Sequence, residues 1–169
     1  IAGNAGVGTT DSNNYVVDTV RPTATIIVAD TAIAAGETSL VTITFSEAIT
    51  GFTSDDLTVA NGVVSGLSSS DGCITWTATF TPTNDITSTS NLISLNAGGI
   101  ADMAGNTNVG TTSSNNYAID TQRTTATIVV ADTALSVGET SLVTITFSEA
   151  VSGFDNSDLS VANGTLSAV

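Results

Sequence analysis

Apolar and polar residues alternate along every long segment of this chain. In SLVTITFSE (39–47), the apolar Val41, Ile43 and Phe45 fall on one face of an extended segment, and threonines fall on the other. Residues 74–83 alternate in the same way. Successive side chains of a strand point to opposite faces, so this pattern predicts half-buried β-strands. No segment shows the period of 3.6 residues that is typical of a helix.

The same reasoning predicts about seven strands in roughly 100 residues. Further strands are expected at 23–30, 57–67, 91–95 and 115–120, with Asn61-Gly62 predicting a hairpin turn inside 57–67. Short strands separated by frequent turn signals are typical of an Ig-like sandwich. We therefore predict an all-β fold of Ig-like β-sandwich domains, with Trp76 and Tyr117 in the core.

The chain contains a long internal repeat with an offset of 102 positions. Residues 1–67 pair without a gap with residues 103–169, and 45 of these 67 pairs are identical. A solenoid unit has only about 20–50 residues, so this period fits whole domains in tandem. We predict domains joined end to end by short linkers: the C-terminal end of a preceding repeat (1–20), one complete repeat (21–122) and the N-terminal part of the next (123–169). The first residue is Ile, so we expect a window on a longer chain.

The charge balance excludes several classes of function. Sixteen Asp and Glu residues face two Arg, with no Lys and no His, and the net charge is −14. The lack of His excludes His-dependent catalysis and His-ligated metals. Two Arg cannot neutralise a phosphate backbone, so no nucleic-acid partner is expected. The chain has no apolar run of about 18 residues for membrane insertion, and the lone Cys73 cannot form an internal disulfide. We do not expect an enzyme.

The acidic residues are expected to gather at the ends of each domain. If successive strands alternate in direction, one end of the complete repeat carries Asp18, Glu47, Asp55, Asp56 and Asp102. The other end carries Asp30, Glu37 and Asp85, and it meets Asp120, Glu149, Asp155 and Asp158 of the next repeat. Like charges at close range repel, and the two cations, Arg21 and Arg123, are each expected to form one salt bridge.

A bound dication would offset this repulsion. Ca²⁺ accepts 6–8 oxygen ligands in flexible geometry and ranks first, with Mg²⁺ second. The candidate ligands are Asp18, Glu47, Asp56, Asp102, Asp120, Glu149 and Asp158, followed by Asp30, Asp55 and Asp132. The alternative is that these acids only solvate the loop ends.

Four segments carry a resemblance to a known family: DTVRPT (18–23), VADTAIAAGETSLVTITFSEAITGF (28–52), SDDLTVANG (54–62) and DMAGN (102–106). The chain resembles the bacterial Ig-like repeats in the extender regions of giant secreted adhesins of the RTX type and the biofilm-associated type. The resemblance implies a β-sandwich module at the bacterial cell surface that binds calcium within and between domains. It implies as ligands Asp18, Asp120, Glu47, Glu149 and Asp102. Thr124, where the preceding linker has Pro22, departs from the family pattern.

Three functions follow from these observations. The first is an extracellular structural spacer, stiffened by calcium, whose partners are the neighbouring identical repeats of the same chain. The second is a module that binds a glycan or a protein and gains avidity from its repetition. The third is a subunit of a polymerising filament, completed by strands from other copies in a fibre.

Overall fold

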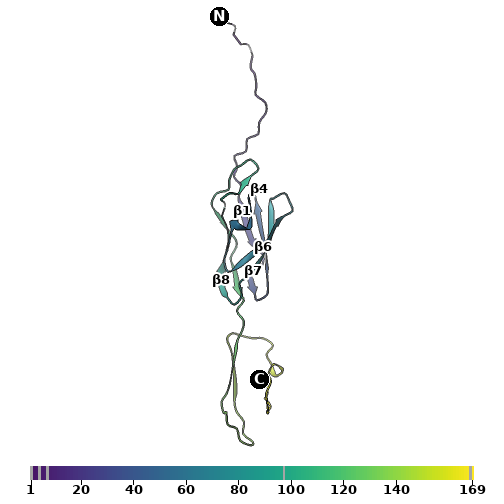
Figure 1. Ribbon diagram of the computed structural model, residues 1–169, viewed down its shortest axis with the longest axis vertical. Coiled ribbons are helices and arrows are strands. Elements are labelled where there is room, and N and C mark those ends of the chain that lie inside the picture. Colours follow the sequence, from purple (N-terminus) through teal and green to yellow (C-terminus); the bar gives the residue numbers. More distant parts are fainter. Residues whose placement is uncertain (1, 4, 7, 97, 168) are drawn as a thin grey trace. The chain divides into compact units, whose positions relative to one another are not determined.

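The computed structural model describes all residues except 1, 4, 7, 97 and 168. The chain divides into two compact units, residues 1–121 and residues 122–169 (Figure 1). Within the described part, the only helices are two short 3₁₀ turns, and no helix could span a membrane. The prediction of an all-β fold is confirmed.

The first layer of the larger unit is a four-stranded antiparallel sheet. Its strands, in spatial order, are β1 (Ala24–Val28), β3 (Ser39–Phe45), β7 (Thr75–Pro82) and β6 (Gly62–Ser69). In β3, buried side chains alternate with more exposed ones along the whole strand, as the sequence predicts. The alternation places one face of this sheet on the core and the other in solvent.

The second layer is built from shorter strands in two three-stranded sets. One set is β11 (Thr111–Ser113), β9 (Ile93–Asn96) and β5 (Leu57–Val59), and the other is β2 (Ala32–Ala34), β12 (Tyr117–Asp120) and β8 (Thr87–Asn91). At one end of the unit, β4 (Ile49–Thr50) pairs with β10 (Ala101–Asp102). The parallel pairing of β12 with β2 brings the last strand beside an early one.

Polar side chains bridge the places where the ladders are interrupted. One such place lies between β9 and β11. Here the N–H of Ile93, the first residue of β9, donates to the Oγ of Ser114, which directly follows β11 (3.0 Å). The side chain of Asn115 holds the edge of the first layer: its Oδ1 accepts the N–H of Val28 (2.8 Å), and its Nδ2 donates to the C=O of Val28 (3.0 Å). Asn115 therefore links the two layers through both backbone groups of one residue.

The core lies between the two layers and contains the predicted aromatic residues. Tyr117 is fully buried against Phe80, with ring centroids 5.0 Å apart, and its hydroxyl donates to the C=O of Ala60 (3.2 Å). Trp76 is half-buried and packs edge-on to Phe52 at 5.2 Å. The Trp76 indole N–H is buried and has no hydrogen-bond partner in the described part of the chain. Both aromatic residues thus contribute to the core, Tyr117 fully and Trp76 in part.

The predicted hairpin at Asn61-Gly62 is wrong. The strand before it, β5, pairs with β9, whereas the strand after it, β6, pairs with β7, so the chain crosses from one layer to the other. Asn61 adopts a positive φ of 54°, and the chain bends at this point. Gly62 is required by packing, because a Cβ there would lie 2.4 Å from Phe80 Cε2 and 2.5 Å from the carbonyl oxygen of Thr81.

The smaller unit repeats the first two paired strands of the sandwich but, among its described residues, has no second layer packed against them. Its strands β13 (Ala126–Val130) and β14 (Val143–Phe147) pair antiparallel in the register of β1 and β3, and a 3₁₀ turn, η2 (Asn156–Asp158), follows. Ile128 is 58% exposed, whereas its counterpart Ile26 is 3% exposed. Residues 122–169 hold no counterpart of residues 68–121, which supply the covering strands in the larger unit. Burial of these side chains therefore depends on the partner strands.

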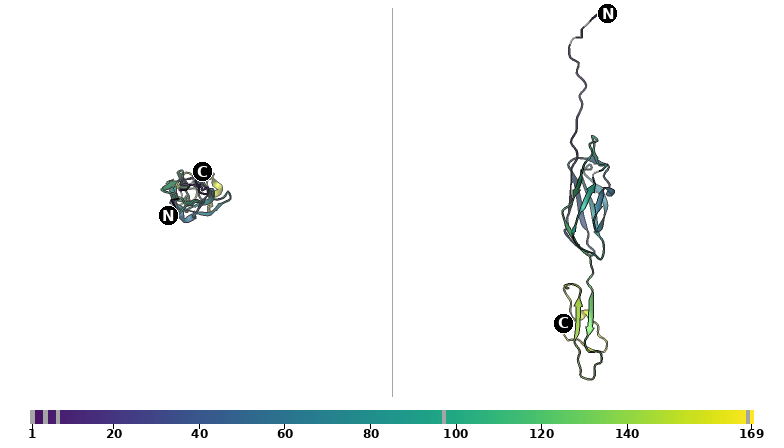
Figure 2. Two further views of the ribbon diagram at one scale, coloured as in Figure 1. Left: turned by 90° about the horizontal axis from the view of Figure 1, so that it is seen from above. Right: turned by 90° about the vertical axis from the view of Figure 1, so that its left-hand side faces the viewer.

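The chain enters and leaves the larger sandwich at opposite ends (Figures 1 and 2). On the entry side, the N–H of Thr23 donates to Ser46 Oγ (3.0 Å), just before β1 begins. On the exit side, the buried Thr121 follows β12, and its hydroxyl donates to the C=O of Thr83 (2.7 Å). Both linker ends are thus bonded to the body of the sandwich.

Candidate metal centre

Three carboxylates converge at the entry end of the larger unit. One carboxylate oxygen each of Asp18, Glu47 and Asp102 lies within 4.8 Å of the others. Asp18 belongs to the segment before β1, Glu47 to the turn after β3, and Asp102 ends β10. The structure thus brings together three of the residues that the sequence placed at this end. We call them the carboxylate cluster.

Asp102 is held in place by the turn that follows it. The side chain is 3% exposed, and its Oδ1 accepts the N–H groups of Ala104 (2.9 Å) and Asn106 (2.7 Å). Asn106 Nδ2 donates to its Oδ2 at 2.8 Å. Burial raises the pKa of Asp102, but hydrogen bonds from Asn106 and from the backbone of Ala104 and Gly105 outweigh it and hold the pKa below its ordinary value. Asp102 is therefore a fixed anion at neutral pH.

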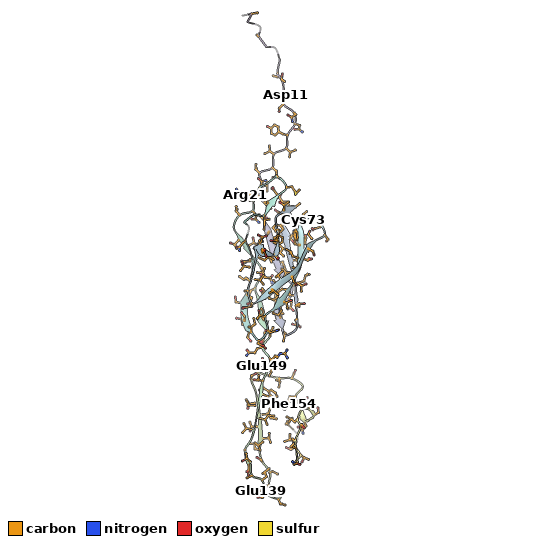
Figure 3. The ribbon with its side chains drawn as sticks, viewed as in Figure 1. Asp11, Arg21, Cys73, Glu139, Glu149 and Phe154 are labelled. Carbon is orange, nitrogen blue, oxygen red and sulfur yellow. The ribbon has the colours of Figure 1, made fainter. Side chains whose placement is uncertain are left out.

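The same turn also binds the linker. Asn106 Nδ2 donates to the backbone C=O of Asp18 (3.1 Å), and Arg21 Nη1 donates to the C=O of Thr107 (3.2 Å; Arg21 is labelled in Figure 3). The predicted salt bridge of Arg21 is wrong, because in the described part of the chain this guanidinium bonds to a backbone carbonyl and to no carboxylate. Sequence reasoning missed Asn106, although it stands in the DMAGN segment.

Glu47 experiences the repulsion that the charge balance predicts. Its pKa is raised by loss of solvation first, then by the charges of Asp102 and Asp18. The charges of Asp102 and Asp18 thus add to the loss of solvation in disfavouring ionisation of Glu47.

The donor set fits a hard dication. All the converging atoms are carboxylate oxygens, which Ca²⁺ and Mg²⁺ prefer over nitrogen or sulfur. Two ligands that each lie about 2.4 Å from one Ca²⁺ ion are at most about 4.8 Å apart, so the spacing of the cluster meets this condition. Ca²⁺ needs six to eight oxygens, and three carboxylates supply three to six of them, leaving room for water.

The remaining predicted ligands of the larger unit lie outside the described cluster, and three of them accept hydrogen bonds from other residues. Asp56 closes the 3₁₀ turn η1 (Ser54–Asp56), where its Oδ2 accepts the N–H of Thr53 (2.8 Å). Asp55 lies in the same turn and is exposed. Asp30 Oδ1 accepts the N–H of Ala32 (3.0 Å) and stabilises the turn after β1. Asp120 Oδ1 accepts the hydroxyl of Thr87 (3.0 Å).

The acids of the smaller unit follow the same local pattern. Asp132 Oδ1 accepts the N–H of Ala134 (2.9 Å), and Asp158 Oδ2 accepts the N–H of Asp155 (3.0 Å) at η2. The Thr124 hydroxyl donates to Glu149 Oε1 at 2.6 Å (Glu149 is labelled in Figure 3). Pro22, at the position equivalent to Thr124, has no hydroxyl and cannot make this bond. The departure from proline therefore adds a contact between Thr124 and the turn after β14.

A family comparison defines the class of protein. The model of the bacterial Ig-like domain family matches residues 18–119 and again residues 120–169. The chain therefore belongs to the bacterial Ig-like domain family, in agreement with its tandem repeat and its sandwich fold.

A solved structure of FdeC, described as a broadly conserved Escherichia coli adhesin, is similar at 18% sequence identity with a TM-score of 0.39. The similarity covers 78% of this chain and 43% of that one, so the chain spans less than half of the FdeC chain. A likeness of this size carries no functional information. A search among curated proteins gives no match.

Proposed function

We propose that this chain is a structural extender module of a long, repetitive bacterial surface adhesin, stiffened by Ca²⁺ at the domain junctions. In this function, closely similar modules in series project a distal binding region away from the cell. The observation that carries the proposal is the carboxylate cluster, in which Asp18 from the linker lies beside Glu47 and Asp102 of the sandwich. An ion bound by all three would fasten the linker to the domain.

Calcium would act on both repulsion and mobility. Bound to the cluster, it would offset the repulsion that raises the pKa of Glu47. An ion that binds only the folded state stabilises it by mass action, by about 2.7 kcal/mol at a concentration 100 times its dissociation constant. Because Asp18 is exposed and lies before the first strand, the ordering effect would be greatest in the linker.

The chemistry of the sandwich favours a spacer over a catalyst or a sugar-binding module. Sugar recognition usually needs exposed aromatic rings, yet the aromatic rings of the larger sandwich pack into or against its core (Phe45, Phe52, Trp76, Phe80 and Tyr117). Membership in the bacterial Ig-like family supports an extracellular location for such a module.

The first test is a calorimetric titration of the 169-residue chain with CaCl₂ after dialysis against a chelator. Asp102→Asn should abolish or weaken the binding by at least tenfold, because it removes one charged ligand from the cluster. Asp55→Asn is the matched control: it removes the same charge from an exposed site outside the described cluster, and binding should be unchanged. The absence of binding heat, or an equal loss in both variants, would contradict the proposed calcium site.

A second measurement addresses the linker. Spin labels on Val16→Cys and Thr111→Cys, in a Cys73→Ser background, report the distance between the linker and the sandwich; Val16 and Thr111 are both exposed. Calcium should narrow the distance distribution, and Asp102→Asn should remove this effect. Calcium binding without narrowing would retain the site and overturn the stiffening function.

A further inference from the structure

The outer face of the four-stranded sheet carries no charge. None of its strands, β1, β3, β6 and β7, contains a charged residue, although the chain has a net charge of −14. The acids of the larger unit described above lie in turns, at strand ends and in the linker. This sheet face is therefore a neutral area on a strongly anionic molecule.

Cross-strand register places hydroxyl side chains in rows on this face. The rows are Thr25–Thr44–Thr75, Ile27–Thr42–Thr77–Ser68 and Leu40–Thr79–Ser65. We call this surface the threonine face. Its aliphatic members are open to solvent: Ile27 and Leu40 are each 53% exposed, and the nearby Val63 is 63% exposed.

The hydroxyls of the threonine face differ from those of the opposite sheet. There, Ser94 bonds to Ser113 at 3.0 Å and Asn96 donates to Thr58 at 3.3 Å, so exposed polar groups satisfy one another. On the threonine face, the hydroxyls of Thr42, Thr77 and Thr79 bond to no protein group in the part of the chain that the structure describes. These donors and acceptors are available to a partner.

The next repeat retains the same surface. In β13 and β14, Thr127 pairs with Thr146 and Val129 pairs with Thr144, in the register of the first repeat. Leu142, 71% exposed, corresponds to Leu40. The first two strands of the next repeat thus carry the corresponding part of these uncharged rows.

We propose that the threonine face packs against the threonine face of a second copy, so that neighbouring chains associate side by side. Two copies repel each other wherever carboxylates meet, and this face is a surface on which they can approach without desolvating a charge. Hydroxyls both donate and accept, so identical rows can pair across a twofold axis. The exposed methyl and aliphatic groups add apolar contact.

The size of the face sets how strong this association is. Four strands about 4.8 Å apart and about seven residues of 3.3 Å each give on the order of 450 Å² for one sandwich. A stable interface buries about 800 Å² on each partner. One pair of sandwiches therefore binds weakly, and strong association needs several faces in parallel.

The test uses beads densely coated with the 169-residue chain, with biotin at its N-terminus, in a buffer that contains a chelator. Wild-type beads should aggregate. Thr77→Asp with Thr79→Asp adds two charges to the threonine face and should slow aggregation at least tenfold. The matched control, Thr89→Asp with Thr111→Asp, adds two charges to exposed positions of the other layer and should aggregate like wild type. Circular dichroism and thermal melting establish that all three chains are folded.

Mixing experiments identify the surface that binds the threonine face. Wild-type beads should exclude beads that carry the Thr77/Thr79 variant; recruitment of these beads would show that the partner surface lies elsewhere and would overturn the proposal. Equal aggregation of both variants, or capture of glycan-coated beads in place of wild-type beads, would overturn it as well. Aggregation that appears only when calcium is added would show that calcium ions join carboxylates of neighbouring chains. That outcome would refute the threonine face without affecting the calorimetric test of the carboxylate cluster.

Discussion

Replacing Gly62 by alanine should destabilise the larger unit, and the same change at Gly164 should not. The two glycines occupy the same position of the repeat. A Cβ at Gly62 would meet Phe80 Cε2 at 2.4 Å, Phe80 Cζ at 2.5 Å and the Thr81 carbonyl oxygen at 2.5 Å. At Gly164 its nearest contact would be Val161 Cγ1 at 3.5 Å, an ordinary van der Waals distance. The difference arises because residues 122–169 have no counterpart of β7.

The magnitude follows from these contacts. Phe80 is fully buried, so its ring cannot move aside without disturbing the core. Overpacking of this kind costs about 1–3 kcal/mol, and the loss of glycine flexibility in the unfolded chain returns about 0.4–1 kcal/mol. We expect a net loss of about 1–2 kcal/mol for Gly62→Ala. With a urea slope of about 1–3 kcal/mol per molar, the unfolding midpoint should fall by roughly 1 M.

The chain provides its own reporter for this measurement. Its single tryptophan, Trp76, lies in β7 of the larger unit, so indole fluorescence during urea unfolding follows that unit alone. Gly164→Ala should leave this midpoint within error of wild type. An unchanged midpoint for Gly62→Ala, or equal shifts for both variants, would refute the packing argument and the crossing from β5 to β6 that depends on it.

Three further predictions concern single side chains of the larger unit. Asn115→Ala should cost about 2 kcal/mol in urea unfolding, because it leaves the N–H and C=O of the buried Val28 without these bonds; Asn13→Ala, at the same repeat position in the exposed linker, should cost nothing. In chelator, the folded state binds the Glu47 proton more tightly than the unfolded state, since its pKa lies above the ordinary 4.5. The contribution of Glu47 to stability should therefore rise as the pH is lowered through that raised pKa, so the stability difference between wild type and Glu47→Gln should change in this direction across a series of melting curves. Burial raises the pKa of Tyr117 from 10.0 to about 12, so stability should fall as the pH rises from 10 to about 12; a tyrosinate absorbance titration of Tyr15→Phe that gives a midpoint near 10 would contradict this.

The strands could be predicted because alternation is a local property of the sequence. β3 and β7 show it over their whole lengths, and the structure places both in the expected segments. The error at Asn61-Gly62 has a physical reason. These residues favour a turn through their backbone preferences, but which strands pair on either side depends on packing across the sandwich, here on Phe80 beneath Gly62.

The candidate site could be predicted in outline from the topology. Asp18, Glu47 and Asp102 follow from the alternating directions of the strands, because each stands where a strand begins or ends. Asp56 met the same criterion, but its oxygens serve the short turn that it closes. Asn106 was not predicted as a connector, because a side-chain amide can bind many backbone groups, and only the folded turn shows that it reaches the linker.

The opposite positions of the two linker ends have a mechanical consequence. Tension transmitted through the chain enters before β1 and leaves after β12, and so it acts along the strands of the sandwich. The ladder between β1 and β3 pairs five positions, and β12 pairs in parallel with β2. Under such tension these hydrogen bonds carry the load in shear, all together, instead of being peeled apart one at a time. The two hydrogen bonds between Asn115, just before β12, and Val28, the last residue of β1, also join the first and last strands of the unit.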